Sequence, residues 1–117
     1  MKTYIKTTTP EKFIKVSVDY TLGGMNLFGA SSSQRGVYAY VQPVTLEDHK
    51  FRDGTSYRTE SYIMFHGVKS LVLACNRKSD KIIKEAEAMV SAELMAKAGV
   101  TWRMVTETAA KDGLVLN

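Results

Sequence analysis

The chain has 117 residues, of which 44% are hydrophobic and 24% charged, and its formal net charge at pH 7 is +4. This length and composition predict one globular domain and exclude a disordered chain or two independent domains. No apolar run approaches the roughly 20 residues that a membrane-spanning helix needs, and the N-terminal residues lack a signal-peptide core. We therefore expect a cytoplasmic protein.

Positive charge is concentrated in two segments of the chain. Residues 1–18 carry a net charge of +3, and residues 66–84 carry +4. The second segment has one acid, Asp80, and five cations, which are Lys69, Arg77, Lys78, Lys81 and Lys84. This placement suits a phosphate-bearing or acidic partner, although solvated lysine-rich helix starts would explain it equally well.

The first half of the chain predicts β-strands. Apolar residues alternate with polar ones over residues 14–22, which is the period of a half-buried strand. Gly23 and Gly24 end or bend this strand, because paired glycines adopt positive φ at little steric cost. The small and polar residues 28–34 then predict an exposed loop.

A second strand begins at Gly36 and runs to Pro43 or beyond. Because proline has no amide proton to donate, Pro43 is expected at a sheet edge or a bulge. Asp53-Gly54 is a turn signal of the type I′ kind. It predicts a hairpin whose return strand covers residues 57–65.

Beyond the hairpin the apolar spacing becomes i, i+3, i+4, i+7, which predicts a buried helical stripe made of Val68, Leu71, Val72 and Cys75. Ser79 is an expected N-cap for a second helical segment, and Gly99 is its expected end. Residues 67–98 thus form one bent helix or two, with a break near residues 76–79. Residues 100–106 predict an optional edge strand, and the tail from Ala109 is expected to fray.

These elements predict an α+β fold, in which a three- to four-stranded antiparallel sheet precedes a long amphipathic helix. The whole chain, residues 1–117, is expected to form a single domain with an ordered core at about 13–106. One face of the sheet would pack against the helix.

Catalytic and metal-binding patterns are absent from the sequence. His49 and His66 are the only histidines and do not form a ligand-spaced pair, and the single cysteine, Cys75, excludes an internal disulfide. Ser31 to Ser33 lie in a loop without a nucleophile motif. We therefore predict a non-enzymatic protein without a metal or cofactor. An enzyme with a site shared between subunits would need a pocket that holds one of the histidines beside an acid.

The strand that opens with Arg35-Gly36 combines aromatic and basic residues. Tyr38, Tyr40 and Gln42 face one side of it, opposite Val37, Ala39 and Val41. Tyrosine rings can stack on bases while nearby cations attract phosphates, although tyrosines that simply cover the sheet as core or interface are the more common arrangement. The predicted nucleic-acid contacts are Lys15, Arg35, Tyr38, Tyr40, Arg58 and Tyr62, with Arg77, Lys78 and Lys81 as a phosphate-facing rim.

The segment Arg35-Gly36-Val37-Tyr38-Ala39-Tyr40-Val41 resembles the Arg-Gly-aromatic strand of Pur-type repeats. The order of elements over residues 13–98 is also similar to those repeats, which have four strands and then a helix. The resemblance implies binding of single-stranded nucleic acid, as in the related PC4-like and Whirly folds, with Arg35, Tyr38 and Tyr40 in contact. The chain departs from the repeats in having one unit, a longer loop and a basic helix start. It also resembles short proteins of bacteriophages and mobile elements, and this resemblance implies a place in the host cytoplasm or in the virion if a phage encodes it.

The sequence therefore predicts a small protein that binds single-stranded DNA or RNA and forms a homo-oligomer, since a lone sheet-and-helix unit leaves strand edges open. The alternative is a phage-type structural, accessory or inhibitory protein that binds a protein partner. That alternative would use the loop with Met25, Leu27 and Phe28, or the apolar face of the helix.

Overall fold

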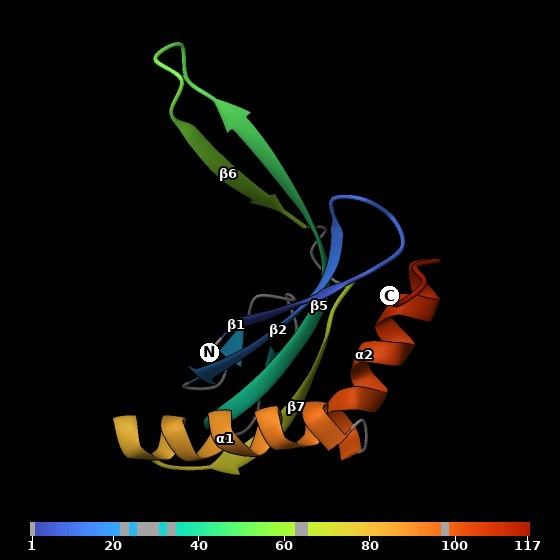
Figure 1. Cartoon of the computed structure of the whole chain (residues 1–117). Coiled ribbons are helices and arrows are strands. Elements are labelled where there is room, and N and C mark those ends of the chain that lie inside the picture. Colours follow the sequence, from blue (N-terminus) through green and yellow to red (C-terminus); the bar gives the residue numbers. More distant parts are fainter. Residues whose placement is uncertain (1, 22–23, 26–30, 33–34, 63–65, 97–98) are drawn as a thin grey trace.

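The computed structural model describes residues 2–21, 24–25, 31–32, 35–62, 66–96 and 99–117. Within them the chain forms a five-stranded antiparallel sheet, a separate two-stranded hairpin and two helices, which confirms the α+β class (Figure 1). The strands are β1 (Lys2–Lys6), β2 (Lys12–Thr21), β3 (Gly24–Met25), β4 (Ser31–Ser32), β5 (Gly36–Lys50), β6 (Ser56–Ser61) and β7 (Val68–Ala74). The helices are α1 (Asp80–Ala96) and α2 (Gly99–Lys111).

The long strand β5 organises the main sheet. Along one edge it pairs with β2, whose outer edge pairs with β1. Along its other edge β5 pairs first with β7 and then with β6. Because β2 begins at Lys12, opposite Thr45, the rest of β5 and its partner β6 continue as a bare two-stranded arm. This arm, residues 46–60, projects from the body of the molecule (Figure 1).

Pro43 lies where the second edge of β5 changes partner. It pairs with Ile14 of β2 on one side. On the other side it falls between Val41, the last residue paired with β7, and Thr45, the first paired with β6. A residue that cannot donate an amide proton is therefore placed at a local gap in the ladder, as expected for a proline in a strand.

The predicted hairpin is present, but its turn is not of type I′. The Gly54 amide donates to the Phe51 carbonyl at 3.1 Å, and the Phe51 amide donates to the Thr55 carbonyl at 2.8 Å. Type I′ needs positive φ at both central residues, whereas here only Gly54, at φ 92°, has it. The loop is a type I turn followed by a left-handed glycine. The return strand β6 ends at Ser61, and residues 63–65 of the predicted strand lie outside the described residues.

Both helices pack on one face of the sheet and meet at an angle (Figure 1). The alternation read from the sequence is confirmed, because every second residue from Ile14 to Val18 of β2 and from Val37 to Val41 of β5 points into this core. The buried cluster consists of Ile14, Val16, Val18, Val37, Ala39 and Val41 from the sheet and Ala86, Val90, Met104, Val105 and Ala109 from the helices.

The segment predicted as the first helical stripe is the strand β7. Its pairing with β5 contains an irregularity, since Tyr38 pairs with Leu71 while Val37 pairs with Leu73. Val72 is therefore an extra residue, and the bulge shifts the alternation of side chains by one position. As a result Val68, Val72 and Cys75 all pack against the core, at a spacing that imitates a helix.

The predicted edge strand at residues 100–106 is instead part of α2. Its buried residues recur at helical spacing and are Thr101, Met104, Val105, Thr108 and Ala109. The β-branched residues of this segment favour a strand locally, but packing against the sheet overrides that preference. Gly99, predicted to end the preceding helix, is the first residue of α2.

The start of α1 agrees with the sequence. The Ser79 hydroxyl accepts the Ile82 amide proton at 3.2 Å, so Ser79 is the N-cap and the helix begins at Asp80. The two ends of the chain are also tied together, which extends the packed structure beyond residues 13–106. The Thr8 amide donates to the Val115 carbonyl, and the Asn117 amide donates to the Lys6 carbonyl, so the tail is paired rather than frayed.

Candidate nucleic-acid interface

Tyr38 and Tyr40 lie on the face of the sheet opposite the helices, where they form a cluster of their own. Their rings are buried, so they cover the sheet, which was the alternative to an open stacking surface. Tyr38 is 7% exposed and Tyr40 is 3% exposed, and their ring centroids are 6.3 Å apart. Burial raises the pKa of the Tyr40 phenol above its ordinary value. Neither ring offers a free face for a base.

One side of the Tyr38 ring is occupied by a lysine of β7. The Lys69 Nζ lies 5.0 Å from the ring centroid, a cation–π distance. This ammonium group is buried and has no hydrogen-bond partner among the described residues. Lys69 was not among the predicted contacts, and both its ammonium group and the Tyr38 ring that it covers are buried.

Lys15, on the same face of the sheet, is engaged by a carboxylate. Its Nζ lies 2.6 Å from Glu60 Oε1, and the Tyr4 hydroxyl donates to Glu60 Oε2 at 2.6 Å. Burial would raise the pKa of Glu60, but the hydrogen bonds from Lys15 and Tyr4 outweigh it and lower that pKa. The hydrogen bond to Glu60, with a smaller contribution from burial, raises the pKa of Tyr4 to about 12. This network joins the outer strands β1 and β6 across the sheet.

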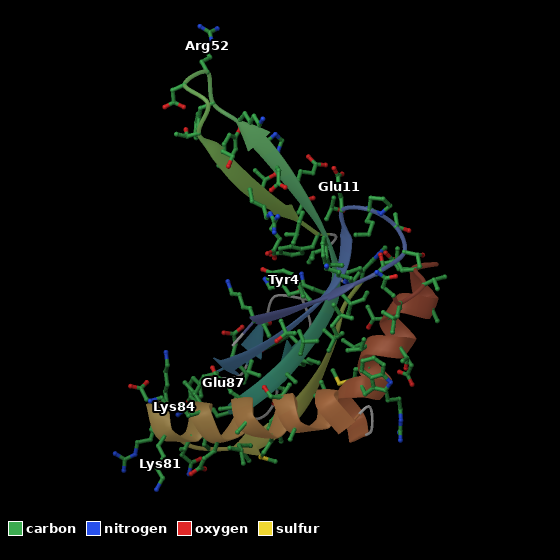
Figure 2. All side chains as sticks on the ribbon, viewed as in Figure 1. Tyr4, Glu11, Arg52, Lys81, Lys84 and Glu87 are labelled. Carbon is green, nitrogen blue, oxygen red and sulfur yellow. The ribbon has the colours of Figure 1, made fainter. Side chains whose placement is uncertain are left out.

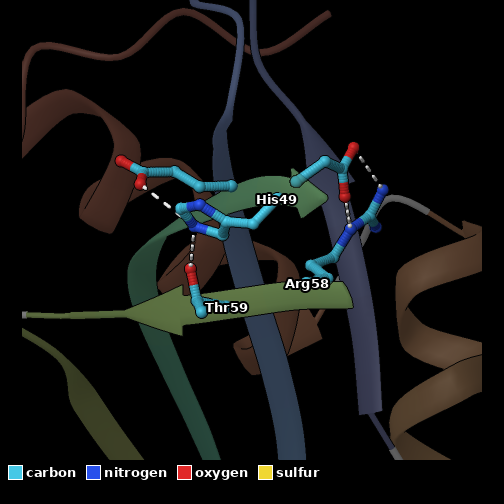
Figure 3. A network of polar contacts seen from close by, with 5 residues as sticks. His49, Arg58 and Thr59 are labelled. Atoms are coloured by element: carbon cyan, nitrogen blue, oxygen red, sulfur yellow. Dashed lines mark hydrogen bonds and ion pairs between the residues drawn. The ribbon is translucent and has the colours of Figure 1, made fainter. Parts of the chain in front are cut away.

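Arg58 sits on the arm, directly opposite Asp48. Its Nε donates to Asp48 Oδ1 at 2.8 Å, and this hydrogen bond lowers the pKa of the carboxyl group (Figure 3). Both side chains are mostly exposed, so this ion pair contributes little to stability. Tyr62, which follows β6, is 43% exposed and is the one predicted ring that solvent reaches freely.

The remaining predicted cations, together with Lys84, gather where β5 begins, β7 ends and α1 begins. The Cys75 amide donates to the Arg35 carbonyl at 3.3 Å, and Gly36 pairs with Ala74, so Arg35 lies beside the link to α1. We call this group the basic corner; its members, all exposed, are Arg35, Arg77, Lys78, Lys81 and Lys84.

The basic corner has little internal compensation. Asp80 is the one acid between Arg77 and Lys84 in the sequence. Glu85 follows Lys84, but none of the five cations forms an ion pair with another described residue. Lys81 and Lys84 extend from the outer end of α1 (Figure 2). The N-terminus of a helix carries a partial positive charge, which adds to the attraction of this corner for anions.

An exposed aromatic ladder on the arm escaped the sequence reasoning. It consists of His49, Phe51 and Tyr57, with ring centroids 5.0 Å apart for His49 and Tyr57 and 4.6 Å apart for Phe51 and Tyr57. Phe51 is 57% exposed and Tyr57 is 42% exposed. The signal was present, because a hairpin centred near Asp53 places Tyr57 opposite His49. The ladder could be predicted only if the register of the two strands was known.

His49 is also held by polar contacts at the base of this ladder. Its Nε2 lies 2.9 Å from Thr59 Oγ1 and 3.7 Å from Glu47 Oε2 (Figure 3). Across the residues that the structure describes, no cluster of three or more histidine, cysteine or acidic side chains could hold a metal ion. The contacts to Thr59 and Glu47 fix the orientation of the His49 ring.

No helix in the described part of the chain is both long enough and apolar enough to cross a membrane. The likeness to Pur-type repeats rests on the short motif at Arg35 and on the order of elements. The chain matches no family model, no curated protein and no solved structure.

Proposed function

We propose that this protein binds nucleic acid through phosphate contacts at the basic corner. The observation that carries the proposal is the convergence of five exposed cations from three segments, with one acid among them, at the N-terminus of a helix. The proposal differs from the sequence-based expectation in one respect. The buried rings of Tyr38 and Tyr40 support the sheet, and the contact to the ligand is electrostatic.

Phosphate contact of this kind has a quantitative signature. Each neutralised phosphate of a single strand contributes about −0.7 to the slope of log K against log salt concentration. Four to five contacts at the basic corner then give a slope of about −3. The preference for single strands follows the sequence-based prediction, and equal-length single- and double-stranded oligonucleotides test it.

The experiment is a fluorescence anisotropy titration of labelled oligonucleotides at about 50 and 200 mM salt. The variant Lys78→Gln/Lys81→Gln removes two cations of the basic corner and should weaken binding roughly tenfold at the lower salt. The matched control is Lys50→Gln/Arg52→Gln, which removes the same charge from the arm. Figure 2 places Arg52 at the tip of the arm, at the opposite end of the molecule from Lys81 and Lys84.

The control should bind as the unmodified protein does. Absence of salt-dependent binding would contradict the proposal. An equal loss in both double variants would also contradict it, because the attraction would then come from net charge rather than from the corner.

A second candidate function, protein association through the arm, is favoured by the aromatic ladder. Exposed aromatic residues are typical centres of protein interfaces. The arm has four acids, Glu47, Asp48, Asp53 and Glu60, against three cations, Lys50, Arg52 and Arg58, so it has no positive excess for nucleic acid. Self-association is the simplest form of this function. Sedimentation equilibrium should then show a concentration-dependent oligomer that Phe51→Ser/Tyr57→Ser abolishes, whereas a monomer at every concentration would contradict it.

A further inference from the structure

A cavity of about 270 Å³ lies at the base of the arm, where segments far apart in the sequence meet. It is somewhat smaller than the pockets that usually hold drug-sized ligands. Its described walls come from the start of β2, the middle of β5, the end of β6 with the residue after it, the segment before β7 and the residue after α2. The lining residues are Lys12, Pro43, Val44, Thr45, Ser61, Tyr62, His66 and Asp112.

The cavity contains an oriented imidazole. His66 Nδ1 lies 3.2 Å from Asp112 Oδ1. Because a carboxylate accepts a hydrogen bond, the Nδ1 atom carries the proton, and in the neutral ring Nε2 is left as an acceptor. Nε2 has no hydrogen-bond partner among the described residues. The histidine thus keeps one nitrogen ready for a ligand.

The cavity also contains an ammonium group without a carboxylate. The Lys12 Nζ donates to Thr45 Oγ1 at 2.8 Å, and it forms no ion pair within the described part of the chain. Lys12 is exposed, so its ammonium group is open to an anion from solvent. Ser61 and Tyr62 add two further hydroxyl groups to the walls.

This set of groups selects a particular chemistry. The ammonium group of Lys12 can donate to an anionic oxygen, and Nε2 of His66 can accept a hydrogen bond from a hydroxyl group. A tetrahedral oxyanion that keeps one hydroxyl meets both requirements at once. Sulfate has the same shape and charge as monohydrogen phosphate but has no proton to donate.

We propose that this cavity binds a small oxyanion that retains a hydroxyl group, with monohydrogen phosphate as its simplest member. In the complex, a charged oxygen accepts from Lys12 and the P–OH group donates to His66 Nε2. His66 beside Asp112 also meets the geometric requirement stated for an enzyme. However, no described nucleophile contacts Nε2, so the geometry favours the binding of a ligand over catalysis. The site is independent of the basic corner, because it shares no residue with it.

The test uses the two histidines of the chain as reporters. Side-chain NMR signals of His66 and His49 are followed while inorganic phosphate or sulfate is added at constant ionic strength and about pH 8, where histidine is ordinarily neutral. His49 is the matched control, because it too lies near a carboxylate but does not line the cavity. Phosphate should shift the His66 signals to saturation and leave those of His49 in place.

Sulfate should bind at least about tenfold more weakly than phosphate, which corresponds to one lost hydrogen bond. Lys12→Gln should weaken phosphate binding by a similar factor, and Lys50→Gln should not. Equal effects of phosphate and sulfate on the unmodified protein would overturn the proposal, as would parallel shifts of His49. That comparison needs no variant and is unaffected by any change in folding.

Discussion

At the scale of single residues, Gly36 has a packing role that explains the Arg35-Gly36 pair. A Cβ atom at this position would lie 2.4 Å from the Leu73 carbonyl oxygen and 2.8 Å from Leu71 Cδ1. A backbone oxygen held in a sheet cannot move away easily. The glycine therefore allows β7 to approach β5 closely, whether or not the neighbouring arginine contacts a ligand.

We expect Gly36→Ala to lower the free energy of unfolding by about 2 kcal/mol through overpacking. Gly54→Ala is the matched comparison, because a Cβ there meets no atom within 4 Å and only the positive φ opposes it. That strain costs about 1 kcal/mol. Urea denaturation of both variants measures the difference. A loss in Gly36→Ala that does not exceed the loss in Gly54→Ala would show that β7 can move away.

The hydrogen bond between Tyr4 and Glu60 gives a prediction at alkaline pH. The pKa of Tyr4 is raised from 10.0 to about 12 in the folded protein. The protonated Tyr4 hydroxyl therefore stabilises the fold fully at pH values below the pKa that Tyr4 has in the unfolded chain. This contribution is lost as pH rises from about 10 through about 12. Phenolate absorbance of the unmodified protein minus that of Tyr4→Phe isolates this group. Its midpoint should lie near 12, and a midpoint near 10 would mean that the hydrogen bond is absent in solution.

The contribution of Glu60 to stability changes with pH in the opposite direction, at acidic pH. Its pKa is lowered in the folded state, so its contribution is present above the unfolded value and is lost as pH falls through the folded one. The same network thus stabilises the sheet between these two limits. Tyr4 and Lys15 could not be joined to Glu60 from the sequence, because the three residues come from strands whose order was unknown.

At the scale of elements, the strands with strict alternation were predicted correctly and those with irregularities were not. β2 and the first half of β5 have both faces defined by every second residue, so their core positions followed directly. β7 failed because the bulge at Val72 changes the spacing, and α2 failed because its β-branched residues suggested a strand. In both cases the deciding information is a contact with β5 or with the core, which local patterns do not contain.

The N-cap of α1 is an element-scale feature that the sequence did predict, and it can be tested directly. Ser79→Ala removes the hydroxyl that accepts the Ile82 amide proton, so stability should fall by about 1 kcal/mol and the melting temperature by roughly 4 °C. Ser79→Asp should keep most of the stability, since aspartate is also a good N-cap. Equal melting temperatures for the alanine variant and the unmodified protein in thermal denaturation would show that the cap contributes nothing.

At the scale of the whole molecule, the candidate site was predicted by charge better than by aromatic residues. The cations at residues 77–84 were placed together because they are close in the sequence, and the fold adds Arg35 through the pairing of β5 with β7. The face of Tyr38 and Tyr40 was also predicted correctly. Their burial was not, because strand alternation reports direction and not what covers a face. The aromatic ladder required the register of the arm, which depends on the turn at Gly54.

The arm and the body should differ in local stability. Hairpins of two strands are marginally stable in water. Beyond Leu46, whose amide donates to the Glu11 carbonyl, the arm has exposed edges on both sides, whereas β5 in the body is paired along both edges. Amide exchange reports such local opening. In dilute solution, amides of residues 46–60 should therefore exchange well before those of residues 36–41.

Protein concentration decides how that difference is interpreted. If a second copy covers the aromatic ladder, exchange in the arm slows as concentration rises, while exchange in the body stays constant. The variant Phe51→Ser/Tyr57→Ser should remove this concentration dependence without affecting residues 36–41. Arm amides that are as well protected as the body in dilute solution, and in the variant too, would contradict the prediction. The hairpin would then be stable by itself, and its exposed rings would not need a partner to order it.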